Sequence, residues 1–182
     1  MPRLTPIAAK SDLPAEHQGV ADAVLKVFGR IRGPYSMLLH APNLAERLLP
    51  LVPFFREESM VEPPLRSLAI LTAVRECDAA YVWAAQVAAA RRNGLREEVI
   101  DLLRAKGDPA KLPADERDII NYIRQVVRTN RVDQATFDSL KSRHDAQWMV
   151  EMTAAGTYYM FVSKFINPFE VPAPQDGDKL PG

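Results

Sequence analysis

The sequence predicts an all-α domain, and the distribution of its prolines gives the first evidence. The chain has 182 residues and 15 prolines, but two long windows, residues 65–108 and 114–167, contain none. Because proline breaks helix interiors, such windows are where long helices lie. Apolar residues recur at three- and four-residue spacing in and around these windows, and no alternating strand pattern is convincing. We therefore predict seven or eight helices in one bundle.

Start and stop residues delimit the expected helices. Gly33 and Gly94 are typical stops, and Asp133 and Asp145 are typical N-caps, because a carboxylate there accepts hydrogen bonds from the first-turn amides. Pro50 and Pro53 would divide one segment into two short pieces. The expected helical segments are 14–32, 43–58 in two pieces, 64–76, 77–93, 95–105, 114–130, a short helix after Asp133, and 146–166.

Two of these helices are apolar nearly all round. Residues 79–90 contain one strongly polar side chain, Gln86, and residues 148–165 are apolar and aromatic between Glu151 and Lys164. Such helices are covered on more than one side, in the centre of a bundle or at a subunit interface. A buried Gln86 amide would need a hydrogen-bond partner, which we expect on a neighbouring helix rather than in a catalytic role.

Composition excludes several function classes. Lys and Arg together number 23, as do Asp and Glu, so no strong field attracts nucleic acid. No apolar run is long enough to span a membrane, and the first residues lack a signal-peptide core, so we expect a cytoplasmic protein. Cys77 is the only cysteine, and the three histidines fall in separate elements. We therefore expect no disulfide and no metal.

Candidate chemistry concentrates between residues 66 and 86. Glu76 is either a solvated partner of Arg75 or a pocket carboxylate, and neither alternative is favoured. Cys77 fits a small buried hydrophobe better than a nucleophile. Tyr81 and Trp83 fit core aromatics, although each carries a donor that a ligand could use.

Two long stretches carry a family resemblance. The run PPLRSLAILTAVRECDAAYVWAAQVAAARRNGLREEVIDLL resembles the central segment of the carboxymuconolactone decarboxylase family, which shares its helical fold with alkylhydroperoxidase D-like proteins. The later stretch from ERDIINYIRQVV to YYMFVSKF looks like the second half of the longer members. The resemblance covers most of residues 14–166 and implies one domain over 1–166, followed by a proline-rich extended tail over 167–182.

The resemblance also shows where this chain departs from the family. Gln86 stands at the position of the family's characteristic histidine. Ala79 and Val82 stand where peroxidase-type members have a C-x-x-C pair, and Ser67 replaces their upstream glutamate. The branch without the cysteine pair, which acts without metal or cofactor on a small lactone carboxylate from aromatic-compound catabolism, is therefore the better match.

That branch implies a set of site residues. Arg66 would hold a carboxylate, Glu76 or Tyr81 would donate a proton, and Gln86 would donate a hydrogen bond. Cys77 and Trp83 would contact the small-molecule substrate. Two alternatives remain open: a thiol-dependent antioxidant protein in which Cys77 acts alone, and a non-catalytic small-molecule-binding protein. Relatives of this type assemble into trimers or hexamers, so we expect a homo-oligomer.

Overall fold

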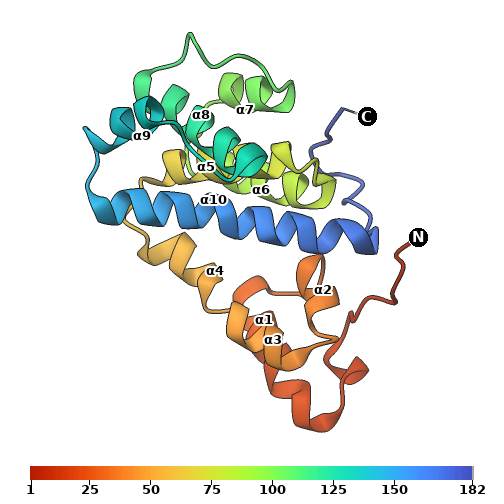
Figure 1. The fold of residues 1–182 in the computed structure, drawn as a ribbon. Coiled ribbons are helices and arrows are strands. Elements are labelled where there is room, and N and C mark those ends of the chain that lie inside the picture. Colours follow the sequence, from red (N-terminus) through yellow and green to blue (C-terminus); the bar gives the residue numbers. More distant parts are fainter. Residues whose placement is uncertain (182) are drawn as a thin grey trace. The chain divides into compact units, whose positions relative to one another are not determined.

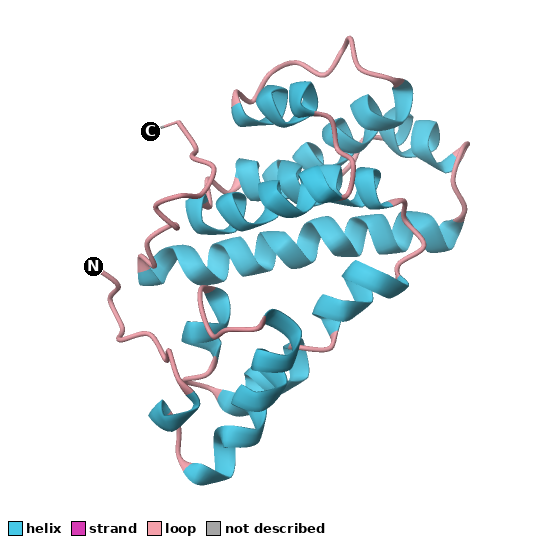
Figure 2. Cartoon of the chain, turned by 180° about the vertical axis from the view of Figure 1, so that it is seen from behind, coloured by secondary structure: helices cyan, strands magenta, loops and turns pink. Residues whose placement is uncertain are grey.

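The computed structural model describes residues 1–181, which form helices and loops without a strand (Figure 1; Figure 2). Eight helices have seven residues or more, and the predicted all-α class is confirmed. The α-helices are α1 (Gln18–Phe28), α2 (Pro34–Leu38), α3 (Pro42–Leu48), α4 (Leu51–Pro53), α5 (Pro63–Glu76), α6 (Ala80–Arg92), α7 (Glu97–Arg104), α8 (Ala114–Thr129), α9 (Gln134–Lys141) and α10 (Ala146–Ile166).

The described chain forms two compact units. The first consists of Met1–Ser59 and Phe165–Pro172, and the second of Met60–Lys164 and the residues from Ala173 on. The first unit contains the short helices α1 to α4. The predicted interruption at Pro50 is present there, whereas α2 was not predicted, because five residues are too few to show a helical period. The second unit holds every candidate site residue.

Helix α5 is the centre of the second unit. All ten residues from Arg66 to Arg75 are buried, because α6, α7 and α8 pack around the helix. Helices α6 and α10 contain the two segments that the sequence showed to be apolar nearly all round, yet each helix has an exposed side. On α10, Val150 and Phe161 remain 68% and 41% exposed. The most covered helix is therefore α5.

Helix α10 packs against α5 and α8 at a glycine. A Cβ added to Gly156 would lie 2.6 Å from Cδ1 of Ile123 on α8 and 3.7 Å from the carbonyl oxygen of Ala69 on α5. A larger side chain at this position would have to displace the Ile123 side chain, so the glycine permits the observed packing. Near the start of α10, the Trp148 indole N–H donates to Glu62 at 2.9 Å.

Both predicted aspartate N-caps are confirmed. The Asp133 carboxylate accepts a hydrogen bond from the amide of Thr136 at 2.8 Å, at the start of α9. The Asp145 carboxylate accepts one from the amide of Trp148, also at 2.8 Å, at the start of α10. Each bond satisfies a first-turn amide that has no partner within its own helix.

Candidate functional site

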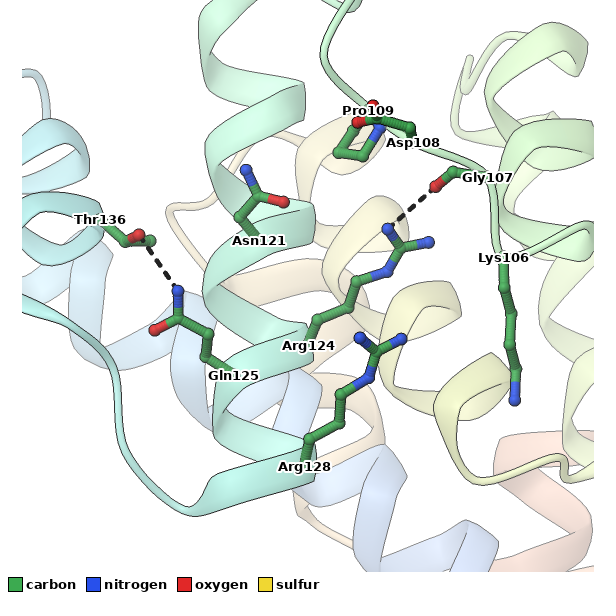
Figure 3. A pocket seen from close by; sticks show the side chains of 9 residues that line it. All are labelled: Lys106, Gly107, Asp108, Pro109, Asn121, Arg124, Gln125, Arg128 and Thr136. Carbon is green, nitrogen blue, oxygen red and sulfur yellow. Dashed lines mark hydrogen bonds between the residues drawn. The ribbon is translucent and has the colours of Figure 1, made fainter.

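A polar pocket opens beside the C-terminal end of α5 (Figure 3). Its volume is about 420 Å³, which is within the range of small-molecule sites. The walls come from the connection between α7 and α8, from one face of α8 and from the first turn of α9. The lining residues are Lys106, Gly107, Asp108, Pro109, Asn121, Arg124, Gln125, Arg128 and Thr136.

Two arginines on α8 are held by one buried carboxylate. Arg124 and Arg128 lie four residues apart and therefore share a helix face. The Glu76 side chain is only 5% exposed, and its two oxygens accept hydrogen bonds from Nε of Arg124 at 3.2 Å and Nε of Arg128 at 2.7 Å. Arg124 also donates through Nη1 to the carbonyl oxygen of Gly107 at 2.9 Å. Glu76 thus fixes both guanidinium groups at the pocket wall.

Several guanidinium donors remain available in this pocket. Among residues 1–181, neither Nη atom of Arg128 nor Nη2 of Arg124 has a hydrogen-bond partner. Lys106 adds a third cation and pairs with Asp78 at 3.1 Å. When Glu76, Asp78 and Asp108 are counted with these cations, the charges balance. An anion would therefore be attracted by the unpartnered N–H groups rather than by net charge.

Hydrogen bonds hold the α9 side of the pocket in place. The Gln125 side chain donates to the Asp133 carboxylate at 2.6 Å and accepts from the backbone amide of Asp133 at 2.8 Å. It also donates to the hydroxyl of Thr136 at 3.3 Å, the contact drawn in Figure 3. This wall is therefore fixed to the capped start of α9.

The structure separates Arg66 from Glu76. Arg66 is buried and donates to the carbonyl oxygen of Val61 at 2.8 Å. Burial lowers the pKa of Arg66, while the electrostatic influence of Tyr159 and Glu151 on α10 opposes that change. Ten residues separate Arg66 from Glu76, about 15 Å along the helix axis. One small substrate does not reach both side chains.

Cys77 lies at the C-cap of α5 and is half-buried. Burial raises the pKa of the Cys77 thiol, and Asp78 and Glu76 add to this effect, while Lys164 and Lys106 oppose it. The reactive thiolate is therefore disfavoured. The expectation that Cys77 is a structural residue rather than a nucleophile stays a prediction.

The candidates on α6 lie in different environments. Tyr81 and Gln86 are half-buried. The Gln86 amide makes no hydrogen bond within the described part of the chain, so the expected bond to a neighbouring helix is absent and the expectation was wrong. Its partial exposure removes the need for an internal partner, because water can satisfy the amide. Trp83 is fully buried, and its indole N–H donates to Asp178 of the C-terminal segment at 3.1 Å.

The remaining family positions are structural. Ser67 is buried, and its hydroxyl accepts a hydrogen bond from the side-chain amide of Asn93 at 2.9 Å. Ala79 and Val82, at the positions of the C-x-x-C pair, are also buried. None of the three is a titratable group, so these positions contribute packing rather than redox chemistry.

Sequence reasoning selected Glu76 but missed the cations around it. Arg124 and Arg128 carried a signal, because arginines at i and i+4 on an amphipathic helix lie on its polar face. The signal is weak, since most such pairs are solvated. Lys106 has a positive φ of 52°, a backbone feature that no sequence pattern indicated.

The fold and pocket define an all-α protein with a small polar cavity beside its central helix. No family model matches the sequence, and neither does any curated protein. Among solved structures, the chain is similar to a protein from Agrobacterium tumefaciens, described as being of unknown function and as a candidate antioxidant defence protein AhpD. The TM-score is 0.70 at 16% identity, and the match covers 80% of this chain and all of the other.

This likeness confirms the AhpD-like helical fold that the sequence resemblance implied, and at this identity it shows the fold alone. Two negative findings apply to residues 1–181. No helix there combines the length and apolar character needed to cross a membrane. No group of three or more histidine, cysteine or acidic side chains there is arranged to hold a metal ion.

Proposed function

We propose that the pocket of Figure 3 binds a small organic carboxylate, and that the protein is a cofactor-free lyase of the carboxymuconolactone decarboxylase type. The observation that carries the proposal is the presence of Lys106, Arg124 and Arg128 in one cavity of about 420 Å³. Guanidinium groups match the geometry of carboxylate oxygens, and a cavity of this size accommodates a substituted five- or six-membered ring.

The arginines and Lys106 would assist different steps of the reaction. When a lactone carboxylate loses carbon dioxide, the C–C bond breaks and its electron pair moves onto the conjugated lactone carbonyl, forming an enolate. The unpartnered N–H groups of Arg124 and Arg128 would stabilise the enolate oxygen. Lys106 would then transfer a proton to the ring carbon and recover one from water. Carbon dioxide and the protonated lactone are the products.

In this proposal Glu76 is a positioning residue rather than the proton donor. Both of its oxygens already accept hydrogen bonds from the arginines, and its side chain is nearly inaccessible. Arg66, Tyr81 and Gln86 are not among the lining residues of this pocket. The earlier assignment of catalytic roles to these three residues stays a prediction that the proposed site does not require.

The experiment measures binding and turnover separately. The purified chain is titrated calorimetrically with a panel of lactone and cyclic carboxylates, and carbon dioxide release is followed for each. Arg128→Gln should weaken binding about tenfold or more, because it removes hydrogen bonds to a charged group. Lys106→Gln should retain most of the binding and lose turnover.

Arg92→Gln is the matched control, because Arg92 is exposed at the end of α6 and outside the pocket. Binding without turnover across the panel would remove the lyase assignment and leave a small-molecule-binding protein. If no carboxylate binds, or if Arg128→Gln and Arg92→Gln behave alike, the pocket is not a carboxylate site.

Assembly into a trimer or hexamer remains part of the proposal. Val150 and Phe161 lie eleven residues apart on α10, which places them on the same helix face, and both are large exposed apolar side chains. Apolar side chains gathered on one face favour association with another protein surface. Light scattering at working concentration tests this, and a monomer would contradict it.

A further inference from the structure

The C-terminal segment places one carboxylate among three donors on α6 and α7. Oδ1 of Asp178 accepts from the Trp83 indole N–H at 3.1 Å and from Nη2 of Arg104 at 2.9 Å. Oδ2 accepts from Nη2 of Arg91 at 3.0 Å. The Asp178 side chain is only 14% exposed. These contacts resemble the recognition of a bound carboxylate.

The donors belong to the helical part of the unit, and only the acceptor comes from the segment. Trp83 is completely buried, and a buried indole N–H requires an acceptor. The Arg104 guanidinium carbon lies 6.0 Å from the centre of the Trp83 ring, so cation and indole face the same place. The space between the Trp83 indole N–H and the Arg104 guanidinium therefore requires an acceptor, supplied either by the chain or by a ligand.

The segment that supplies Asp178 has little regular structure. Residues from Ala173 to Pro181 contain no helix, and within the described part of the chain their backbone makes one hydrogen bond, from the amide of Gly177 to the carbonyl oxygen of Pro174. Gly177 lies so close to α6 that an added Cβ would be 2.7 Å from Cβ of Ala84. Without a helix and with one backbone hydrogen bond of its own, this segment opens at lower energetic cost than the packed helices beside it.

We infer that Trp83, Arg91 and Arg104 form a second carboxylate-binding site, which Asp178 fills until a ligand displaces it. The ligand is a small molecule with a carboxylate for the three donors and an apolar body for the surface beside Ala84, where Gly177 now lies. This site shares no residue with the pocket of Figure 3, so the inference does not rest on the proposed function.

The test uses sodium benzoate as the probe and benzamide as its neutral analogue. The full-length chain is labelled with ¹⁵N, and the indole N–H signals of its two tryptophans are distinguished with Trp148→Phe. Asp178→Asn removes the negative charge with which residue 178 competes against the ligand. Gly177→Ala keeps that carboxylate but pushes the segment away from Ala84 by steric conflict. Asp176→Asn is the matched control, because Asp176 is exposed in the same segment.

We expect benzoate to shift the Trp83 signal and to bind Asp178→Asn and Gly177→Ala about tenfold more tightly than the unmodified chain. Asp176→Asn should match the unmodified chain, and benzamide should leave the signal in place. Adding Arg104→Gln to Asp178→Asn should abolish the benzoate shift. Arg128→Gln, which tests the other pocket, should not change this titration.

The inference is overturned if benzoate leaves the Trp83 signal unmoved in both Asp178→Asn and Gly177→Ala, or if affinity is equal in all forms. A shift of the same size with benzamide would also overturn it, because the site would then not recognise a carboxylate. Since the Trp83 signal reports this site and calorimetry on Arg128→Gln reports the pocket of Figure 3, failure of one proposal is distinguishable from failure of the other.

Discussion

Replacing Glu76 with glutamine tests the central electrostatic feature of the pocket. Glutamine retains the shape of the side chain but removes the charge that faces Arg124 and Arg128. The Arg124 side chain is only 11% exposed, and burial lowers its pKa while Glu76 opposes that effect. Glu76→Gln therefore leaves a mostly buried cation without its counter-charge.

The expected loss in the free energy of unfolding is about 3 kcal/mol, the lower part of the range for breaking a buried ion pair. For a chain of this length, such a loss corresponds to a decrease in Tm of about 9 °C. Arg128 adds little to this figure, because its side chain is 53% exposed and its pairing is screened by water.

The assay is reversible urea or thermal unfolding monitored by circular dichroism. Arg128→Gln is the control and should cost less than about 1 kcal/mol. The double variant Glu76→Gln with Arg124→Gln should recover part of the loss, because it removes the unpaired cation. A Glu76→Gln protein within about 0.5 kcal/mol of the unmodified chain would refute the reasoning, since that is the range of neutral surface substitutions.

Ligand binding by the same variant distinguishes the two roles considered for Glu76. If the carboxylate positions the arginines, Glu76→Gln should bind carboxylates less tightly, because the guanidinium groups lose the acceptor that orients them. If it donates the proton in catalysis, turnover should fall while affinity stays the same. Weaker binding with loss of stability would support the positioning role.

Two further predictions concern titrating groups. Cys77→Ser should leave any peroxide consumption unchanged, and iodoacetamide should modify Cys77 more slowly than free cysteine at pH 7.5, because burial raises the thiol pKa; fast alkylation would contradict this. Burial alone would raise the pKa of Asp178, but hydrogen bonds from Trp83, Arg104 and Arg91 lower it below its ordinary value of 3.8. Its stabilising contribution is therefore present at neutral pH and is lost as the pH falls through 3.8 and below. The difference in unfolding free energy between the chain and Asp178→Asn should shrink over that range, and a constant difference would contradict the assignment.

Local signals account for most of the helices. The caps at Asp133 and Asp145 and the interruption at Pro50 depend on residues within one turn of the feature, so the sequence alone predicts them. The burial of α5 depends on where other helices pack, which local sequence does not encode. Its charged residues Arg66 and Arg75 gave no local sign of burial, yet both arginines are buried.

The sites depend on contacts between residues far apart in the sequence. Glu76 is 48 residues from Arg124, and Asp178 is 95 residues from Trp83. In each case the sequence identified one partner, Glu76 or Trp83, because both lie in the segment that resembles the decarboxylase family. Apart from Arg91 on α6, the other partners lie on α7, α8 and the C-terminal segment, where composition indicated only solvated charge or an extended tail.

The two cationic sites differ in how their charges are satisfied, and this difference suggests different roles. In the pocket of Figure 3, the carboxylate of Glu76 comes from a central helix and cannot leave without disrupting the unit. At Trp83, the carboxylate of Asp178 comes from residues 173–181, which contain no helix and which, in our inference, a ligand displaces while the helices stay packed. A fixed internal anion orients donors for an external ligand, whereas a removable one competes with that ligand. The first arrangement suits a site that is permanently formed, and the second suits a site whose occupancy depends on ligand concentration.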